Sequence, residues 1–294
     1  MTLGKAGPVV VRAVASDVDR FTAAEPAVRA DRPDAVHSMR VATRRLRSVL
    51  RTYRKVFGRD MVDPLRSELT WFGGILGPAR DAEVMAMRFE ELIGDGPPEL
   101  VIGPVADRLV AAQRARYDAG LARVHAELDG ERYRNLRTAL DAVAAGGTST
   151  ASATKPAAIV LTLGLSNEYR RLRNDIRVEF AAGTADRIAA LHEVRKSAKR
   201  LRYAAEAATP ALGDSAERVG QAAKALQSLL GDHRDAAEAQ ELIMSTVAEA
   251  RAAGEDTFTY GLLHMSLEQA AHQAISGYPA ALESLTVACA ALDA

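Results

Sequence analysis

The chain has 294 residues, enough to bury one large hydrophobic core or two smaller ones. Its 38 basic and 38 acidic residues cancel, so the overall basicity that is typical of general nucleic-acid binders is absent. A single cysteine, Cys289, excludes an internal disulfide framework and a cysteine-based zinc site, and it is compatible with a reducing cytosol. No stretch approaches the ~18 apolar residues of a membrane span, so we expect a soluble cytoplasmic protein without membrane contact.

The chain is predicted to be helical from end to end. Aromatic residues make up only 5% of it, and no segment shows sustained alternation of β-branched residues, so we predict an all-α fold. Helices are predicted over residues 8–28, 34–57, 61–76, 79–94, 99–128 and 131–145, and then over 156–181, 185–208, 214–230, 233–253, 257–275 and 278–292. Gly58 and Gly213 are expected to end helices, and Gly77-Pro78 and Gly231 to separate neighbouring ones.

A basic signature lies in the second predicted helix and returns 155 residues later. It reads H-x-x-R-x-x-x-[RK]-R-L-R and begins at His37 and again at His192. Around the first copy, residues 35–59 hold eight Lys or Arg and no acid. At about 100° per residue, one side of this helix carries His37, Arg40, Arg44, Arg47, Arg51, Arg54 and Lys55, and the far side carries Met39, Leu46, Val49, Leu50, Tyr53, Val56 and Phe57. The pattern predicts a helix with a buried apolar face and a separate cationic face.

The two parts of the chain correspond beyond the signature. Phe57-Gly58 matches Leu212-Gly213, and the segment 75–81 matches 229–235. Between the parts, residues 146–154 are small and polar without periodicity, which is typical of a flexible linker. We therefore predict an internal duplication with a first helical half over 1–145, a linker over 146–155 and a second half over 156–294, because a repeat this long is a duplicated domain and not a solenoid unit.

A run of charge on a helix is most often a solvated face, but two features point elsewhere. Like charges four residues apart, such as Arg40 with Arg44 and Arg47 with Arg51, oppose helix formation by about 0.2–0.5 kcal/mol per pair. Of the 38 basic residues 32 are Arg, whose planar fork suits two phosphate oxygens at once. We infer that a polyanion supplies the missing countercharge, although common ancestry of the halves also explains the match between them.

Other candidate residues leave alternatives open. A lone histidine such as His37 or His192 is more often structural than catalytic, and no companion ligands for zinc or manganese accompany either one. Arg80-Asp81 and Arg234-Asp235 follow a glycine at a predicted helix junction. In one interpretation each Asp caps a helix and the Arg is solvated. In the other, each Arg joins the cationic surface and each Asp pairs with signature arginines and orients them. Lys224 and Gln227 lie one turn apart and could extend the second stripe.

The doubled signature, with Leu-Gly-x-x-Arg-Asp downstream in each half, resembles the CHAD family, the conserved-histidine α-helical domain. The resemblance covers nearly the whole chain. It implies two four-helix-bundle-like halves related by pseudo-two-fold symmetry, which bind inorganic polyphosphate on a basic groove or channel between them. It also implies polyphosphate granules as a location, and polyphosphate-metabolising enzymes or granule proteins as partners. Family members often accompany a triphosphate-processing CYTH domain, whose E-x-E-x-K start we do not find in this chain.

Carried over by position, the resemblance implies a polyphosphate-binding set. From the first half and then the second, its members are His37, Arg40, Arg44, Arg45, Arg47, Arg51, Arg80, His192, Arg195, Lys199, Arg200, Arg202, Lys224 and Arg234. Glu206 stands at the position equivalent to Arg51, so we expect the second stripe to bind more weakly at its C-terminal end.

These residues predict a binding protein and not an enzyme, with no cofactor and no metal. The alternative is a metal-dependent phosphohydrolase or phosphoryl-transfer enzyme that uses His37 or His192, but the signature helices offer almost none of the carboxylates that hold Mg²⁺ near phosphates. Nucleic acid is disfavoured as a partner, because no aromatic platform is interleaved with the basic residues.

Overall fold

The computed structural model describes residues 4–146 and 150–292, and within them the chain is all-α. The first part comprises α1 (Ala6–Arg29), α2 (Ala35–Thr52), α3 (Arg54–Phe57), α4 (Arg59–Gly94), the 3₁₀ turn η1 (Pro98–Leu100), the π turn η2 (Asp107–Ala111), α5 (Ala112–Leu128) and α6 (Glu131–Ala144). The second comprises α7 (Ala157–Ala181), α8 (Thr184–Leu212), α9 (Asp214–Ala252), α10 (Phe258–Ser276) and α11 (Tyr278–Ala290). The predicted fold class is confirmed.

Two predicted helix boundaries are wrong, because α4 runs unbroken through Gly77-Pro78 and α9 runs through Gly231. Leu76 and Ala79 are fully buried on either side of the predicted break in α4, and Gly231 is itself buried in α9. Relative to alanine, a helical glycine costs about 1 kcal/mol and an interior proline about 3 kcal/mol. Burying one large apolar side chain gains about 1.5–3 kcal/mol, and α4 buries several of them, including Phe72, Leu76 and Phe89, so the apolar row as a whole outweighs the local breaking signal.

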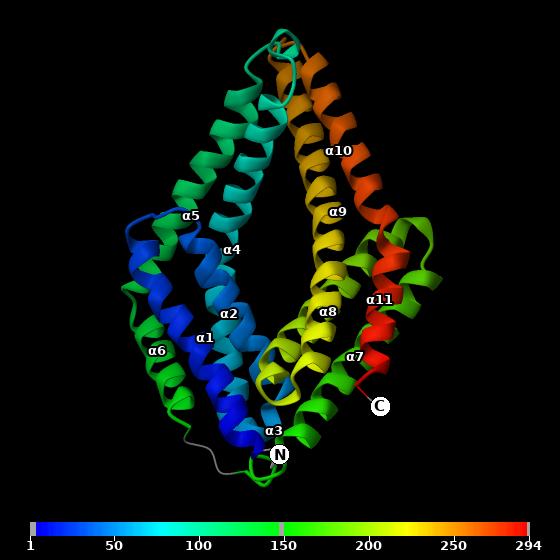
Figure 1. The fold of residues 1–294 in the computed structure, drawn as a ribbon. Helices are drawn as coiled ribbons and strands as arrows, with labels where there is room; N and C mark the ends of the chain where they lie inside the picture. The colour runs from blue at the N-terminus through cyan, green and yellow to red at the C-terminus, as the bar shows by residue number, and fades with distance from the viewer. Residues whose placement is uncertain (1–3, 147–149, 293–294) are drawn as a thin grey trace. The chain divides into compact units, whose positions relative to one another are not determined.

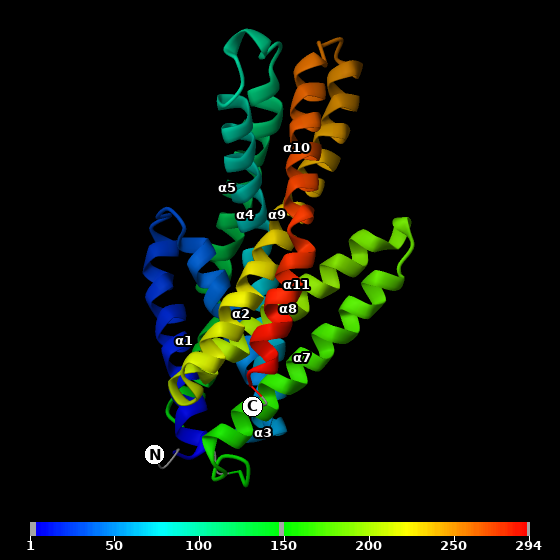
Figure 2. The same ribbon diagram turned by 45° about the vertical axis from the view of Figure 1, so that its right-hand side comes forward.

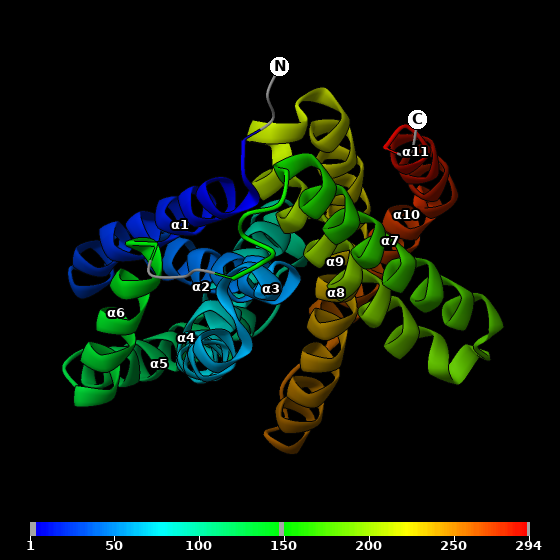
Figure 3. The same ribbon diagram turned by 90° about the horizontal axis from the view of Figure 1, so that it is seen from below.

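One predicted helix, 34–57, is instead divided at Tyr53. This residue leaves the helical conformation at φ −104° and ψ 24°, so α2 ends at Thr52 and the short α3 begins at Arg54. Its ring is buried, and its hydroxyl donates a hydrogen bond of 3.0 Å to the carbonyl oxygen of Ala204 in α8. The break therefore lets one large side chain reach a buried acceptor on another helix. Figure 3 shows α3 directly after the end of α2.

The structure divides into two compact units, which we describe separately. Unit 1 comprises residues 1–74, 125–228 and 279–294, and unit 2 comprises 75–124 and 229–278. Each unit draws segments from both of the sequence halves that we predicted. The division into a first half over 1–145 and a second over 156–294 stays a prediction.

Unit 1 packs its helices in pairs. α1 lies along α2 (Figure 1), and α7 and α8 form a hairpin closed by Ala182-Gly183 (Figure 2). α2 and α8 also contact each other, and α1 contacts α6, α7 and α8. The apolar face that we predicted for residues 39–57 is buried throughout, from Met39 to Phe57. This packing fixes the side of α2 on which the signature arginines lie.

Part of the predicted linker contacts α1 and α3. Residues 147–149 lie outside the described residues, and the segment 150–155 is hydrogen-bonded to these two helices. The amides of Ala6 and Gly7 in α1 donate to the carbonyls of Lys155 and Ala153, each at 2.9 Å. The Thr150 hydroxyl donates to two carbonyls of α3. This described part is therefore a fixed loop against α1 and α3.

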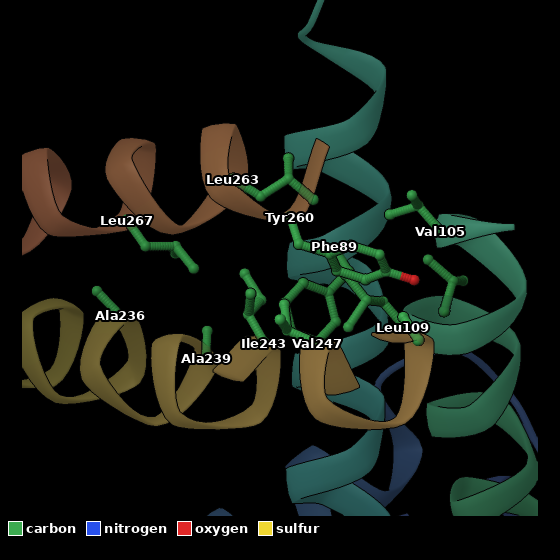
Figure 4. Packing of buried hydrophobic residues seen from close by; sticks show 12 residues of the cluster. Phe89, Val105, Leu109, Ala236, Ala239, Ile243, Val247, Tyr260, Leu263 and Leu267 are labelled. Atoms are coloured by element: carbon green, nitrogen blue, oxygen red, sulfur yellow. The ribbon is translucent and has the colours of Figure 1, made fainter. Parts of the chain in front are cut away.

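Unit 2 has its own apolar core, shown in Figure 4. Phe89, Leu109, Ile243 and Tyr260 come from four different elements and pack together, each fully buried. The α4 and α5 backbones approach closely, because a Cβ placed on Gly120 would lie 2.9 Å from the backbone of α4. Among the helices of residues 4–146 and 150–292, none combines the length and hydropathy that a bilayer crossing requires.

Candidate anion-binding surface

The two signature helices, α2 and α8, pack against each other in unit 1. Each buries a row at helical spacing: Met39, Leu46 and Leu50 on α2, and Val194, Ala198 and Leu201 on α8. The basic residues of both signatures occupy the intervening positions and are half-buried. The predicted separation of an apolar face from a cationic face is therefore confirmed for α2, and α8 shows the same arrangement.

Arg44 of α2 and Arg195 of α8 bring the two signatures together. Burial is the main cause that lowers the pKa of Arg44. The electrostatic effect of Tyr203 raises this pKa, while the positive charges of Arg40 and Arg195 lower it further. The Nε atoms of Arg44 and Arg195 are buried, and neither has a hydrogen-bond partner among the described residues. Folding thus places like charges near one another without an internal counterion at these nitrogens.

The positive charge continues along α2 and onto α4. Burial lowers the pKa of Arg47, and so does the nearby charge of Arg66. Burial also lowers the pKa of Arg51, with a contribution from Arg200 and an opposing one from Glu168. Within the described residues, neither Arg47 nor Arg51 forms an ion pair. We name the set Arg40, Arg44, Arg47, Arg51, Arg66 and Arg195 the cationic cluster.

Arg66 is the member that sequence reasoning missed. It lies in α4, outside the signature, and Asp63 and Glu68 nearby give its segment a mixed charge. Its ion pair with Asp63 is 3.3 Å long, while its buried Nε has no partner among the described residues. Only the fold shows that the charge of this arginine lies near those of Arg47 and Arg51, since no spacing rule links α4 to α2.

Arg45 and Arg202 are held by carboxylates instead. Arg45 Nε donates to buried Asp17 at 2.8 Å, and Arg45 also pairs with Glu206 of α8. Glu206 accepts a second hydrogen bond, of 2.7 Å, from Arg202 Nε. Both guanidinium groups lie over the Tyr203 ring, at 5.3 and 5.4 Å from its centroid. Burial lowers the pKa of Arg45, but Asp17 and Glu206 outweigh it and the pKa is raised.

This network gives Glu206 a structural role. One carboxylate joins α2 to α8 through its two arginine partners. Arg45 and Arg202 were predicted as polyphosphate ligands, and their existing ion pairs weigh against that role. Weaker anion binding at the C-terminal end of the second stripe stays a prediction. The pairing of Glu206 with Arg45 and Arg202 gives a physical reason for it, because the carboxylate partly neutralises both guanidinium groups.

Arg200 is also partly neutralised. It contacts the Ser197 hydroxyl and lies 3.8 Å from Glu168 and 3.7 Å from Asp175. Glu168 is fully buried and accepts a hydrogen bond of 2.6 Å from Arg171. Arg200 therefore contributes charge near Arg51, but it shares that charge with two carboxylates.

The two signature histidines lie on α2 and α8. His37 is half-buried and lines a hollow of about 620 Å³ between α1 and α2, together with Arg20, Arg32 and Arg45. His192 and Lys199 are half-buried on α8. Lys224 is exposed on α9, while Gln227 accepts a hydrogen bond of 3.3 Å from Arg202. The roles of these residues as ligands stay predictions.

Arg80 and Arg234 belong to unit 2, whereas the other predicted ligands belong to unit 1. Arg80 donates to Glu83 at 2.8 Å, and Arg234 donates to Glu238 at 2.6 Å. Both lie inside continuous helices. The interpretation of Asp81 and Asp235 as caps is therefore wrong, because neither stands near a helix N-terminus. Within the described part of the chain, His, Cys, Asp and Glu form no group of three or more that could hold a metal ion.

Known proteins resemble this chain in sequence and in fold. The family model described as the CHAD domain matches residues 12–244. The chain belongs to the CHAD family. This CHAD chain is 39% identical over 280 residues to an uncharacterized protein from each of two strains of Mycobacterium tuberculosis, CDC 1551 / Oshkosh and ATCC 25618 / H37Rv. The match covers 94% of this chain and 53% of theirs, so the chain spans about half the length of these relatives.

Two solved structures share the CHAD fold. PptA from Streptomyces chartreusis superposes with a TM-score of 0.72 and 19% identity, over 95% of this chain and all of that one. The CHAD domain of the plant Ricinus communis superposes with a TM-score of 0.63 and 21% identity, over 99% and 93% of the two chains. At these identities the likeness establishes the helical architecture alone.

Proposed function

We propose that this chain binds inorganic polyphosphate, and that the cationic cluster of unit 1 contacts its phosphates. The observation that carries the proposal is the meeting of Arg44 and Arg195, whose buried Nε atoms have no partner among the described residues. A buried charge without a counterion is costly, and a bound anion would remove that cost. Membership in the CHAD family supports the same ligand class.

The chemistry of the cluster favours a flexible chain of phosphates over a nucleic acid. Polyphosphate offers charge without base edges, so binding rests on phosphate contacts and counterion release. Tyr203 is buried, and the guanidinium groups of two signature arginines, Arg45 and Arg202, lie over its ring. It therefore offers no platform for base stacking.

The proposed activity is binding without turnover. Phosphate-chain hydrolysis normally uses carboxylates that hold Mg²⁺ beside the phosphates. Around the cationic cluster, Asp17 and Glu206 are already engaged by arginines. Incubation with Mg²⁺ or Mn²⁺ should release no orthophosphate. Release that is abolished by His37→Ala or His192→Ala would support the alternative enzyme.

In the cell, we propose association with polyphosphate granules or with enzymes that make or degrade the polymer. A long polymer bound at several points can tether a protein by multivalency. The fraction of a fluorescent fusion on granules should fall when the cluster is neutralised. Unchanged granule association after neutralisation would exclude the cluster as the anchor.

The direct test is binding of labelled polyphosphate at low salt. A long chain should bind, and a three-phosphate chain should bind much more weakly because it spans fewer arginines. Competition with RNA of equal total charge should leave polyphosphate bound. Arg218, exposed on α9 of unit 1 with no ion pair among the described residues, gives a matched control as Arg218→Gln. No binding, or equal binding of both chain lengths, would contradict the proposal.

A further inference from the structure

A separate basic pocket lies where α3 meets α4 in unit 1. It has a volume of about 290 Å³ and is lined by Arg54, Lys55, Gly58, Arg59, Thr150 and Ser152. It includes no member of the cationic cluster. At ~30 Å³ per water molecule, the space corresponds to about ten waters, enough for one phosphate group with its hydration.

The pocket exists because α2 breaks at Tyr53. A continuous helix would carry Arg54 and Lys55 along the same stripe as Arg51, but the break starts a new helix at Arg54. Gly58, at φ +91°, then turns the chain into α4, which starts at Arg59. Few residues other than glycine adopt this conformation readily. The break and the turn thus bring Arg54, Lys55 and Arg59 around one hollow.

The opposite wall is fixed by hydrogen bonds. The Thr150 hydroxyl donates to the carbonyls of Lys55 and Val56 at 2.8 and 2.9 Å, and it accepts from the Ala153 amide at 3.2 Å. These contacts satisfy carbonyls at the end of α3 that would otherwise repel an anion. Ser152 is half-buried on the same wall, and its hydroxyl has no hydrogen bond to another described residue. The wall thereby offers a hydroxyl donor.

The charge of this pocket is uncompensated. Within residues 4–146 and 150–292, Arg54, Lys55 and Arg59 form no ion pair with a carboxylate. The start of α4 adds the positive end of a helix dipole. Three cations and a hydroxyl around one small hollow favour a compact anion that carries more than one charge.

We propose that this pocket binds a terminal, doubly charged phosphate group. Inner phosphates of a polyphosphate chain carry one charge each, while free orthophosphate and a chain end carry close to two at neutral pH. Both sources present the same chemistry to Arg54, Lys55 and Arg59. The chain-end source rests on the proposed function, whereas orthophosphate binding does not.

The test measures three probes by calorimetry at low salt: orthophosphate, long polyphosphate with free ends, and the same polymer with both ends capped as phosphoramidates, which leave one charge on each end phosphate. The variants are Arg54→Gln with Arg59→Gln, against Arg218→Gln as the exposed control and Arg44→Gln for the cluster. Far-ultraviolet circular dichroism verifies that each variant is folded.

The expected result is a loss of about tenfold in affinity for orthophosphate or for free-ended polymer in the double variant, with no change in the control. Orthophosphate binding that is lost in the double variant but kept in Arg44→Gln identifies free orthophosphate as the ligand of the pocket. This result would stand even if the protein did not bind the polymer at all. A loss confined to the free-ended polymer identifies the chain end. If the folded double variant bound all three probes as tightly as the wild type, the proposal that this pocket binds phosphate would be overturned.

Discussion

Replacing Arg44 by Gln should make the free protein more stable and the complex weaker. The variant removes two like-charge pairs on α2, which Arg44 forms with Arg40 four residues before it and with Arg47 three residues after it. At about 0.2–0.5 kcal/mol per pair, the gain is about 0.4–1 kcal/mol, and relief of repulsion from Arg195 adds to it. Urea unfolding of the free protein measures this gain.

The same variant should lose affinity for polyphosphate. A charge-assisted hydrogen bond to phosphate contributes about 1.5 kcal/mol or more, which corresponds to at least about a tenfold change in Kd. The slope of log Kd against log salt should also fall by about 0.7–0.9, the value for one phosphate contact. Arg218→Gln should change neither slope nor stability appreciably. A destabilised Arg44→Gln variant with unchanged affinity would refute the reasoning, since Arg44 would then be a structural residue.

Three further outcomes follow from the packing and the ion pairs. Glu206→Gln should lower the free energy of unfolding by about 1–2 kcal/mol and yet tighten polyphosphate binding, because both arginine partners lose their carboxylate; weaker binding would contradict this. Gly120→Ala should destabilise by about 1–3 kcal/mol because its Cβ meets the α4 backbone, whereas Gly74→Ala, with open space around it, should not; urea unfolding compares them. A hydrogen bond from Arg132 lowers the pKa of Glu68, so the pair stabilises the fold above the unfolded pKa of about 4.3 and loses this effect as pH falls through the folded pKa. Glu68→Gln keeps the stacking of Arg132 on Trp71 and should thus cost a little stability at neutral pH and nothing in acid, and a cost that persists in acid would refute the assignment.

The sequence predicted the two faces of α2 because they depend on local periodicity. Met39, Leu46 and Leu50 recur at helical spacing, and all are fully buried. The doubled signature likewise pointed to the helices that carry Arg44 and Arg195. That the charges of these two arginines lie close enough to interact is a tertiary fact, which the match between the halves could suggest but not establish.

Other features depend on contacts between distant residues. Asp17 and Glu206 lie far from Arg45 in sequence, so no local pattern showed that this signature arginine is held by carboxylates. The glycines at 77 and 231 signalled helix ends, but burial along α4 and α9 outweighed that signal. The break at Tyr53 came from a buried hydroxyl and its acceptor on α8, and it moved Arg54 out of the predicted stripe.

The central claim is that polyphosphate lies on the cationic cluster, and a structure with a bound short polyphosphate tests it most directly. The account predicts phosphate density within hydrogen-bond distance of the Arg44 and Arg195 guanidinium groups, continuing toward Arg47. Ordered phosphates elsewhere on the protein, with these arginines in contact only with solvent, would contradict it.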